Sequence, residues 1–408
     1  MISVADHLSR CLAAVRPLEP VELDLIRAQD GVLAQDVVSP LDLPGFDNSA
    51  MDGYAVHVRD VAAASVAAPV RLPVVGDVPA GATRQIRLSP GQVVRIMTGA
   101  PMPEGAEAVV PVEDSDGGVR EVLLSASAPG GRHVRRTGAD VRTGDVVLRA
   151  GTVLGPAQLA LLAAVGRSRV RVHPRPRVVV LSTGSELVEP GRLPGFGQVV
   201  DSNGVMVTAA VTEAAADPHH IGLVADEPGP FLATLTDQLQ HADLVVTTGG
   251  VSAGAYDTVK AVLSELGTVW FGKVAMQPGM PQGFGAVGPD ATPIFTLPGN
   301  PVSAFVSFEM FVRPVIRTLA GHSGPGRRTE TATALESWTA PAGKLQLARG
   351  ELGVADDGGR VVRLSGAQGS HVLGGLAQAD CLVVVPEDVT RVEVGDQVQC
   401  LVLDRGRS

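Results

Sequence analysis

The sequence predicts an α/β and β multidomain protein, with a central doubly wound α/β domain, a β-rich domain before it and a C-terminal β-barrel. Short Val-rich strands alternate with helix-like segments from 178 to 319, as in a parallel sheet with helices on both faces. Residues 58–125 and 329–408 instead contain short Val-rich runs between glycines and prolines, which is typical of small β-barrels. Proline- and glycine-rich stretches at 173–177 and 321–328 separate these regions.

The composition is that of a globular protein. The chain has 408 residues, of which 45% are hydrophobic and 19% charged, enough for two to four domains. A net charge of −10 argues against general nucleic-acid binding, which needs a basic surface. Cys11, Cys381 and Cys400 are too far apart for a metal site or disulfide framework, as in a reducing compartment. There is no secretory segment and no long apolar run, so we expect a soluble cytoplasmic protein without a membrane partner.

The N-terminal half is predicted to contain two helices and two polar loops. Residues 3–15 have the spacing of an amphipathic helix with Ser3 as its N-cap, and 154–165 also have helical character. The loop 43–56 is rich in proline, glycine and Asx residues, which favours a solvated turn. The basic loop 130–145 is typical of a solvated face, and it could also attract an anionic substrate.

The α/β region supplies strands that all end at one edge of the predicted sheet, where such sheets bind ligands. The predicted strands lie within 178–187, 199–200, 221–226, 243–247, 269–274 and 293–303, and the helices within 202–215, 231–240, 256–266 and 304–319. His219 and His220 precede one strand. Because adjacent side chains point apart, we interpret them as loop histidines and not as a metal-binding pair.

A glycine-rich loop follows the central strand. Gly249, Gly250 and Gly254 come between the Val-rich run and a helix, so backbone N–H groups and a helix N-terminus face the end of the strand. This geometry suits an anion, although the sequence matches neither the P-loop nor the dinucleotide-binding pattern. Asp257 stands near the first helical turn, where it is either a cap of the helix or a metal ligand or catalytic carboxylate beside the anion.

Three carboxylates and one lysine follow strands of the same sheet. Glu186, Asp226 and Asp257 can converge with Lys273 and with the segment 298–301 on one crevice. Three carboxylates so close together require a counter-charge, and Mg²⁺ prefers oxygen ligands, so we predict a Mg²⁺ site for a substrate that carries phosphate. Lys273 either supplies a positive charge to the anion or is a surface residue of its strand.

A set of motifs resembles one family over nearly the whole chain. In chain order the motifs are SAMDGYAV (49–56), RIMTGAPMPEGAEAVV (95–110), RRTGADVRTGD (135–145), RPRVVVLSTGSEL (175–187), DSN (201–203), TTGGVSAGAYD (247–257), KVAMQPGMP (273–281) and LPGNPVSA (297–304). The chain therefore resembles the molybdopterin molybdenumtransferases, the MoeA and gephyrin E-domain family of molybdenum cofactor biosynthesis.

The resemblance implies four domains and a dimer. The implied domains are a discontinuous N-terminal domain at 1–45 and 141–176, a β-rich insert at 46–140, a MogA/MoaB-like α/β molybdopterin-binding domain at 177–326 and a C-terminal β-barrel at 327–408. The implied assembly is a homodimer, with the site between the α/β domain of one subunit and the insert domain of the other.

The implied reaction is the Mg²⁺-dependent insertion of molybdenum from molybdate into adenylylated molybdopterin with release of AMP, with the adenylyltransferase of the same pathway as a possible partner. Molybdenum prefers the sulfur of the pterin, which fits a protein without a cysteine cluster. By motif position the implied catalytic residues are Asp52, Thr98, Asp140, Glu186, Asp257 and Lys273; the cofactor-binding residues are Gly249, Gly250, Ser252, Gly254, Pro298, Gly299, Asn300, Pro301 and Ser303; and the metal ligands are Glu186, Asp226 and Asp257. For Thr98 the structural alternative is a hydroxyl that satisfies a turn.

The sequence departs from the family pattern at three positions. Gln277 and Met280 stand where the family often has lysines, and Ala139 replaces a glutamate. Two alternatives therefore stay open: a non-catalytic molybdopterin-binding or scaffold protein of the same fold, and a molybdopterin adenylyltransferase. The sequence does not decide between molybdate and tungstate.

Overall fold

The computed structural model describes residues 1–225, 227–249, 258–266, 268–324 and 326–403. The chain forms two compact units, which are described separately. Unit 1 consists of Met1–Val21, Asp30–Ala34 and Arg171–Ser408, and unit 2 consists of Glu22–Gln29 and Gln35–Val170. The finer division into four domains stays a prediction.

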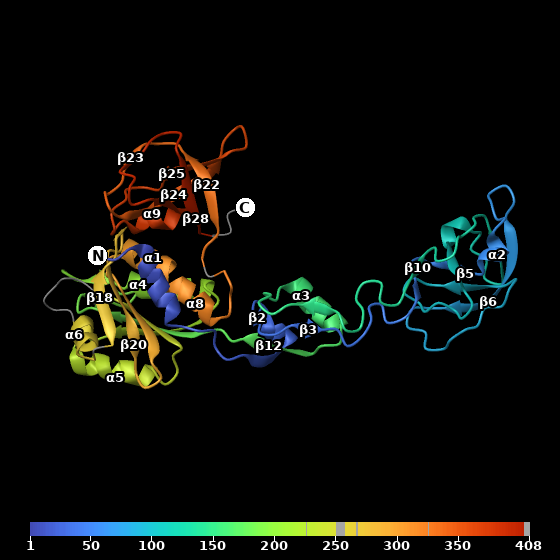
Figure 1. Cartoon of the computed structure of the whole chain (residues 1–408), viewed down its shortest axis with the longest axis horizontal. Helices are drawn as coiled ribbons and strands as arrows, with labels where there is room; N and C mark the ends of the chain where they lie inside the picture. The colour runs from blue at the N-terminus through green and yellow to red at the C-terminus, as the bar shows by residue number, and fades with distance from the viewer. Residues whose placement is uncertain (226, 250–257, 267, 325, 404–408) are drawn as a thin grey trace. The chain divides into compact units, whose positions relative to one another are not determined.

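The central element of unit 1 is a six-stranded mixed sheet (Figure 1). Its strands, in spatial order, are β16 (Asp217–Val224), β13 (Arg177–Thr183), β17 (Leu244–Thr248), β21 (Thr292–Leu297), β20 (Pro281–Val287) and β18 (Val269–Lys273). The first four strands are parallel to one another, as predicted. The prediction of a fully parallel sheet was wrong at the other end, because β20 pairs antiparallel with both β21 and β18. Two antiparallel steps return β18 to the direction of β21, so these two strands end at the same edge.

Side chains that alternate along the strands enter two separate cores, one on each face of the sheet. In β13, Val178 and Val180 enter one core, whereas Val179 and Leu181 enter the other. The first core is covered by α1 (Val4–Ala13), α4 (Ser202–Glu213), α7 (Pro301–Ser307), the π-helical Phe308–Val312 and α8 (Arg313–Leu319), and the second by α5 (Pro228–Gln238) and α6 (Thr258–Glu265). Burial on both faces explains the continuous Val-rich strands and confirms the doubly wound α/β domain.

The C-terminal part of unit 1 is a closed barrel, as predicted. Its strands are β22 (Thr329–Ala334), β24 (Leu345–Val354), β25 (Arg360–Leu364), β26 (Cys381–Val385) and β28 (Gln397–Val402). The sheet order β24-β25-β22-β28-β26 closes because β24 also pairs with β26. A short strand of the α/β domain, β19 (Met276–Gln277), pairs in parallel with β24, so the barrel and the α/β domain share backbone hydrogen bonds.

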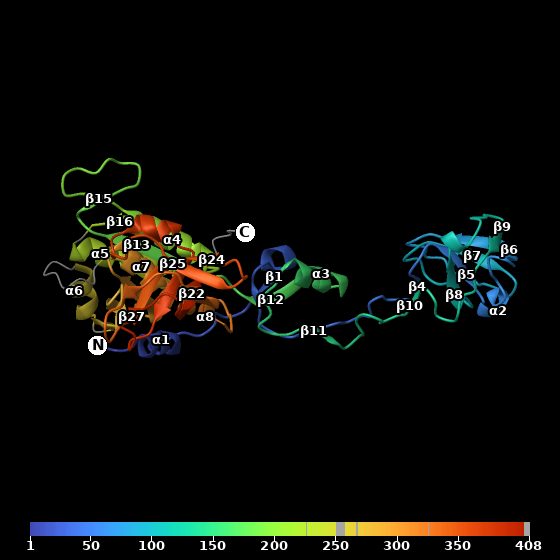
Figure 2. The same cartoon turned by 90° about the horizontal axis from the view of Figure 1, so that it is seen from above.

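Unit 2 contains a five-stranded sheet in the order β8-β5-β7-β6-β9 (Figure 2). The strands are β5 (Gly53–Val56), β6 (Val70–Val78), β7 (Val93–Ile96), β8 (Ala108–Pro111) and β9 (Glu121–Leu124), and the predicted helix is present as α3 (Pro156–Ala164). The β-rich character is confirmed. The expected barrel is instead a curled sheet with an apolar cluster on each face, because no pairing joins its two outer strands among the residues that the structure describes.

The N-terminal helix α1 packs on β18, the outer strand of the α/β sheet. Ser3 caps the helix as predicted, accepting a hydrogen bond from Asp6 N–H at 3.0 Å. His7, which the pattern did not select, is fully buried, with ring centroids 5.2 Å from Trp270 and 4.6 Å from Phe311. Arg10 lies over the Trp270 ring at 5.1 Å. The helix is therefore anchored by aromatic contacts as well as by its aliphatic face.

Two further predictions concern the two adjacent histidines near the start of β16 and the absence of membrane-spanning helices. His219 and His220 are not loop residues, because β16 begins at Asp217 and includes both. The strand starts earlier than its apolar run, since its partner β13 is already extended from Arg177. No helix in the described part of the chain is long and apolar enough to cross a membrane.

We predict that the substitution His7→Phe makes the stability of the protein less dependent on pH. Burial lowers the pKa of His7 to about 4, whereas an unfolded histidine titrates at about 6.5. As the pH falls from about 6.5 toward 4, the unfolded chain takes up a proton that the folded chain excludes, so stability is lost in this window. In urea unfolding, the variant should lose about 2 kcal/mol less than the parent between pH 7 and pH 5. The exposed His371→Phe variant should follow the parent, and parallel curves for His7→Phe and the parent would contradict the account.

Candidate functional site

The carboxyl edge of the α/β sheet gathers several of the predicted site residues. Gly249 lies between two strand ends: its N–H donates to the carbonyl of Leu297 at 3.0 Å, and a Cβ atom at Gly249 would approach the carbonyl of Thr183 to 2.8 Å. Its φ of 90° also disfavours any other residue. The start of the glycine-rich loop is thus fixed at the junction of β13, β17 and β21. The other predicted loop residues, Gly250, Ser252, Gly254 and Asp257, lie outside the described residues, as does Asp226.

The segment after β21 is tied to the start of α4. Asn203 Nδ2 donates to the carbonyl of Gly299 at 2.7 Å, and Asp201 caps α4 by accepting from the N–H of Gly204 at 2.9 Å. Pro298 is buried and Asn300 is exposed, and Pro301 begins α7. Ser303 is buried in the first turn of that helix. The DSN and LPGNP motifs, about a hundred residues apart in sequence, are therefore neighbours at this edge.

Glu186 and Lys273 lie at opposite sides of the same edge. Glu186 follows β13 and is exposed, and Lys273 ends β18 and is exposed. Four strand spacings separate β13 from β18, which is about 19 Å, so the two side chains flank the edge and do not share one contact. Directly after Glu186, the loop between β14 (Leu187–Val188) and β15 (Val199–Val200) projects from the domain (Figure 2) and exposes Phe196 completely.

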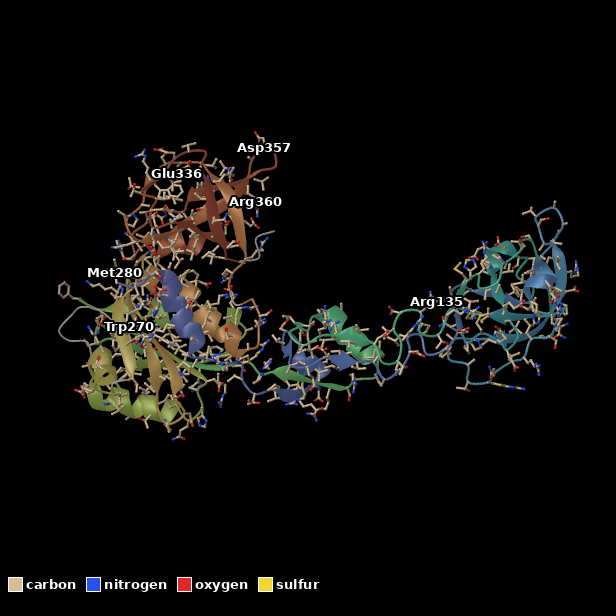
Figure 3. All side chains as sticks on the ribbon, in the orientation of Figure 1. Arg135, Trp270, Met280, Glu336, Asp357 and Arg360 are labelled. Atoms are coloured by element: carbon tan, nitrogen blue, oxygen red, sulfur yellow. The ribbon has the colours of Figure 1, made fainter. Side chains whose placement is uncertain are left out.

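The turn between β18 and β20, residues 273–282, is held on several sides. The side-chain amide of Gln282 donates at 2.6 Å both to the carbonyl of Gly279 and to Ser307 Oγ in α7. Gly279 has a φ of 94°, and a Cβ there would meet Ser307 Oγ at 2.7 Å. Gln277 is exposed and Met280 is half-buried, at the end of the α/β domain beside the barrel (Figure 3). This turn therefore presents a neutral amide and a thioether after Lys273.

The N-terminal segment contacts this turn, and the barrel contacts the start of α7. Ile2 N–H donates to the carbonyl of Lys273 at 3.0 Å, and Ala275 N–H donates to the carbonyl of Ile2 at 2.8 Å. In the barrel, the carbonyl of Ser370 accepts from Val302 N–H at the start of α7 at 3.1 Å. The fully buried Arg349 holds the segment before Ser370 by donating to the carbonyls of Ala367 and Gly369. The sequence pattern missed these contributions because no local spacing links them to the α/β motifs.

In unit 2 the structure brings Asp52 and Thr98 together. Asp52 Oδ1 accepts from the backbone N–H of Thr98 at 2.6 Å and from its hydroxyl at 2.8 Å. These hydrogen bonds hold the pKa of Asp52 below its usual value. Asp140 is exposed, and its N–H donates to the carbonyl of Leu43 at 2.9 Å.

The same bonding pattern occurs twice more in unit 2. Asp47 Oδ1 accepts from the N–H and hydroxyl of Thr137 at 2.8 and 3.0 Å, and Asp42 Oδ1 accepts from those of Thr143 at 2.7 and 3.0 Å. Asp47 also pairs with Arg136 at 2.6 Å, so one arginine of the basic loop is neutralised. Because the same bonding occurs at two other Asp–Thr pairs, we interpret the Asp52–Thr98 pair as stabilising the local fold, in addition to any role in ligand binding.

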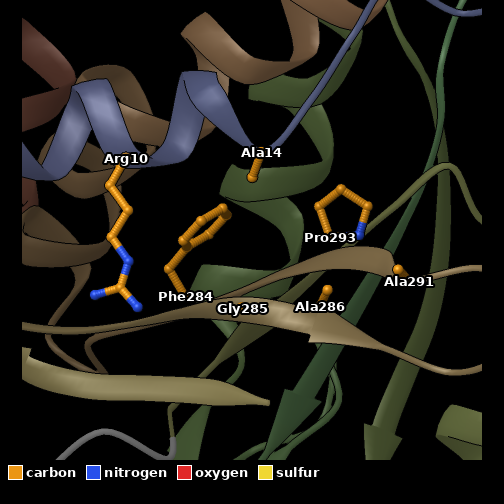
Figure 4. A pocket seen from close by; sticks show the side chains of 7 residues that line it. All are labelled: Arg10, Ala14, Phe284, Gly285, Ala286, Ala291 and Pro293. Atoms are coloured by element: carbon orange, nitrogen blue, oxygen red, sulfur yellow. The ribbon is translucent and has the colours of Figure 1, made fainter.

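A separate pocket of about 250 Å³ lies between α1 and the β20–β21 hairpin (Figure 4). Arg10 and Ala14 line it from the helix, and Phe284, Gly285, Ala286, Ala291 and Pro293 line it from the hairpin. None of the residues that line this pocket is among those predicted for the site.

The described residues contain no group of three or more histidine, cysteine or carboxylate side chains placed to hold a metal ion. Of the three predicted ligands only Glu186 is described, and a single exposed carboxylate does not make a Mg²⁺ site by itself.

Comparison with known proteins assigns the N-terminal, central and C-terminal regions of the chain to one family. A profile described as the MoeA N-terminal region (domain I and II) matches residues 2–166, one described as a probable molybdopterin binding domain matches 179–318, and one described as the MoeA C-terminal region (domain IV) matches 331–403. The chain is also 44% identical over 417 aligned residues to molybdopterin molybdenumtransferase 1 of Mycobacterium tuberculosis, covering 98% of each chain. The chain belongs to the molybdopterin molybdenumtransferase family.

Other members of the family are similar over comparable lengths. Molybdopterin molybdenumtransferase 2 of M. tuberculosis is 46% identical, covering 98% of this chain and 99% of its own, and the Haemophilus influenzae molybdopterin molybdenumtransferase is 36% identical, covering 94% and 93%. A crystal structure of a molybdopterin biosynthesis MoeA protein from Pyrococcus horikoshii superimposes with a TM-score of 0.82 at 31% identity, covering 99% of each chain. Family membership thus confirms the resemblance seen in the motifs.

We predict that Thr98→Val raises the pKa of Asp52. The variant removes the hydroxyl donor from the carboxylate and leaves the backbone N–H donor in place. NMR titration of aspartate carboxyl carbons should show Asp52 below the usual value of about 3.9 in the parent and closer to it in the variant. Because the folded-state pKa is lowered, the associated stability is present above about pH 3.9 and is lost as the pH falls through the folded value. Thr137→Val should shift Asp47 and leave Asp52 unchanged; an Asp52 titration that ignores Thr98→Val would refute the assignment.

Proposed function

We propose that the protein inserts molybdenum from molybdate into adenylylated molybdopterin, with cleavage of the bond to the nucleotide and release of AMP, in a Mg²⁺-dependent reaction. The observation that carries the proposal is the full-length match to the molybdenumtransferase family, together with the meeting of the DSN, TTGG and LPGNP motifs at the carboxyl edge of the sheet. The backbone N–H groups that the sequence predicts for the glycine-rich loop suit the phosphates of the substrate. The soft sulfurs that receive molybdenum belong to the pterin, so the protein has only to hold two anionic reactants together.

We assign roles by motif position and by place in the fold. Lys273 holds an anion through its point charge, and Gly249 with the segment 298–303 contacts the pterin or its phosphate. Glu186, Asp226 and Asp257 are the proposed Mg²⁺ ligands, since carboxylate oxygen is what Mg²⁺ prefers. Asp52, Thr98 and Asp140 are proposed to act from the insert domain of a second subunit in a homodimer. We also propose a cytoplasmic location and four domains with the boundaries expected from the sequence.

A non-catalytic molybdopterin-binding protein is the second candidate. It is favoured by Gln277 and Met280, which leave the turn after β18 with Lys273 as its only cation. An adenylyltransferase is the third candidate, and consumption of ATP would separate it from the first.

The decisive assay measures AMP release from adenylylated molybdopterin with Mg²⁺, with and without molybdate. We expect release that requires molybdate and stops when the Mg²⁺ is chelated, and a loss of about a hundredfold or more in Asp257→Ala. Asp290→Ala is the matched control, because Asp290 lies in the β20–β21 hairpin at the opposite edge of the sheet. Pterin that stays bound without release of AMP would contradict the enzyme and support the binding protein.

A further inference from the structure

We propose that the pocket between α1 and the β20–β21 hairpin binds a small organic carboxylate with an apolar body, such as an aromatic acid. The pocket shares no residue with the site of the proposed function, so the inference goes beyond that function. Three observations carry it: an apolar floor, a volume that suits a small molecule, and an arginine without a carboxylate partner at one end.

The floor of the pocket is formed by the face of the hairpin that α1 covers. Phe284 and Ala286 are two residues apart in β20, and Pro293 is the partner of Ala286 in β21. Their side chains point to the face of α1, because Phe284 belongs to the core beneath that helix. Arg10 and Ala14, one helical turn apart at the end of α1, form the opposite wall (Figure 4). Apart from Arg10, the side chains that line the pocket are therefore apolar.

Small side chains keep the pocket open. Ala14, Ala286 and Ala291 carry only a methyl group and Gly285 carries none, so the helix and the hairpin leave about 250 Å³ between them. This volume lies just below the range of about 300–1,000 Å³ that is usual for pockets of drug-sized ligands. It suits a single substituted ring, and it is too small for a helix of a partner protein.

Arg10 supplies a positive charge at one end of the pocket. Its guanidinium carbon lies 5.1 Å from the centre of the Trp270 ring, and Trp270 is the partner of Phe284 in β18. This contact holds the guanidinium beside the floor without neutralising its charge. Among the residues that the structure describes, Arg10 pairs with no carboxylate and its guanidinium donates no hydrogen bond to the protein. Its N–H groups can therefore bind a carboxylate through two parallel hydrogen bonds.

The floor and the arginine favour different parts of one ligand. An inorganic oxyanion would pair with Arg10 and leave the apolar floor in contact with water. An uncharged ring would cover the floor and leave the guanidinium without a partner. A carboxylate with an apolar ring satisfies both, so it should bind more tightly than a ligand that has only one of the two parts.

The test titrates the whole protein with benzoate and measures binding by saturation-transfer NMR of the ligand. Arg10→Gln should weaken binding about tenfold, because it removes one charge-assisted pair, and Arg10→Lys should lose less, because it keeps the charge. Ala286→Leu should prevent binding by filling the pocket while the charge stays in place. Arg16→Gln is the matched control: Arg16 follows α1, donates to the carbonyls of Ala13 and Val15, and does not line the pocket.

Two further probes separate the parts of the ligand. Acetate has the charge without the ring and benzyl alcohol has the ring without the charge, and we expect both to bind at least about tenfold more weakly than benzoate. The fluorescence of Trp270 locates the site when Trp338→Phe removes the other tryptophan of the chain, and benzoate should change this emission saturably.

Three outcomes would overturn the proposal: no saturable binding of benzoate to the parent, equal binding to Arg10→Gln and the parent, or binding of benzyl alcohol as tight as that of benzoate. A loss of binding in Arg16→Gln as large as in Arg10→Gln would overturn it as well. Urea unfolding checks that each variant is folded. Because Arg10 is exposed, its variants keep the test decisive even if Ala286→Leu does not fold.

Discussion

The turn of residues 273–282 is the junction on which the architecture of unit 1 depends. It receives backbone hydrogen bonds from Ile2 before α1 and from Leu345 in the barrel, and Gln282 ties it to Ser307 in α7. Each bond comes from a different part of the chain, so the turn couples the N-terminal segment, the α/β sheet and the barrel. A rigid turn at the end of a strand is what positions an anion with little loss of conformational entropy on binding.

The fold class could be predicted from the sequence because the burial of each strand or helix determines its local pattern of apolar residues. Strands such as β13 are apolar on both faces, since each face meets its own core. What could not be predicted depends on tertiary partners. The reversal at β20 follows from the hairpin with β21, and the burial of His7 follows from the aromatic side chains that surround it. In the same way, Arg327 of the predicted linker is buried against Glu309 at 2.7 Å, which a composition of glycine and arginine does not reveal.

The candidate site likewise combines features that the sequence could predict with features that depend on tertiary contacts. Gly249 lies at the strand ends, where its positive φ and its close approach to Thr183 require glycine. The Asp52–Thr98 bond joins residues 46 positions apart and depends on the pairing of β5 with β7. The backbone contacts of Ser370 and Leu345 come from the barrel and follow from tertiary pairing, which a single sequence does not encode visibly.

The central claim, that oxyanion binding centres on the turn, is tested most directly by hydrogen–deuterium exchange of the whole protein with and without molybdate. The account predicts slower exchange in the turn and in the start of β24, because a bound anion would restrain the backbone groups that join them. Protection confined to other regions, such as the pocket beneath Arg10, with unchanged exchange in the turn, would contradict the account.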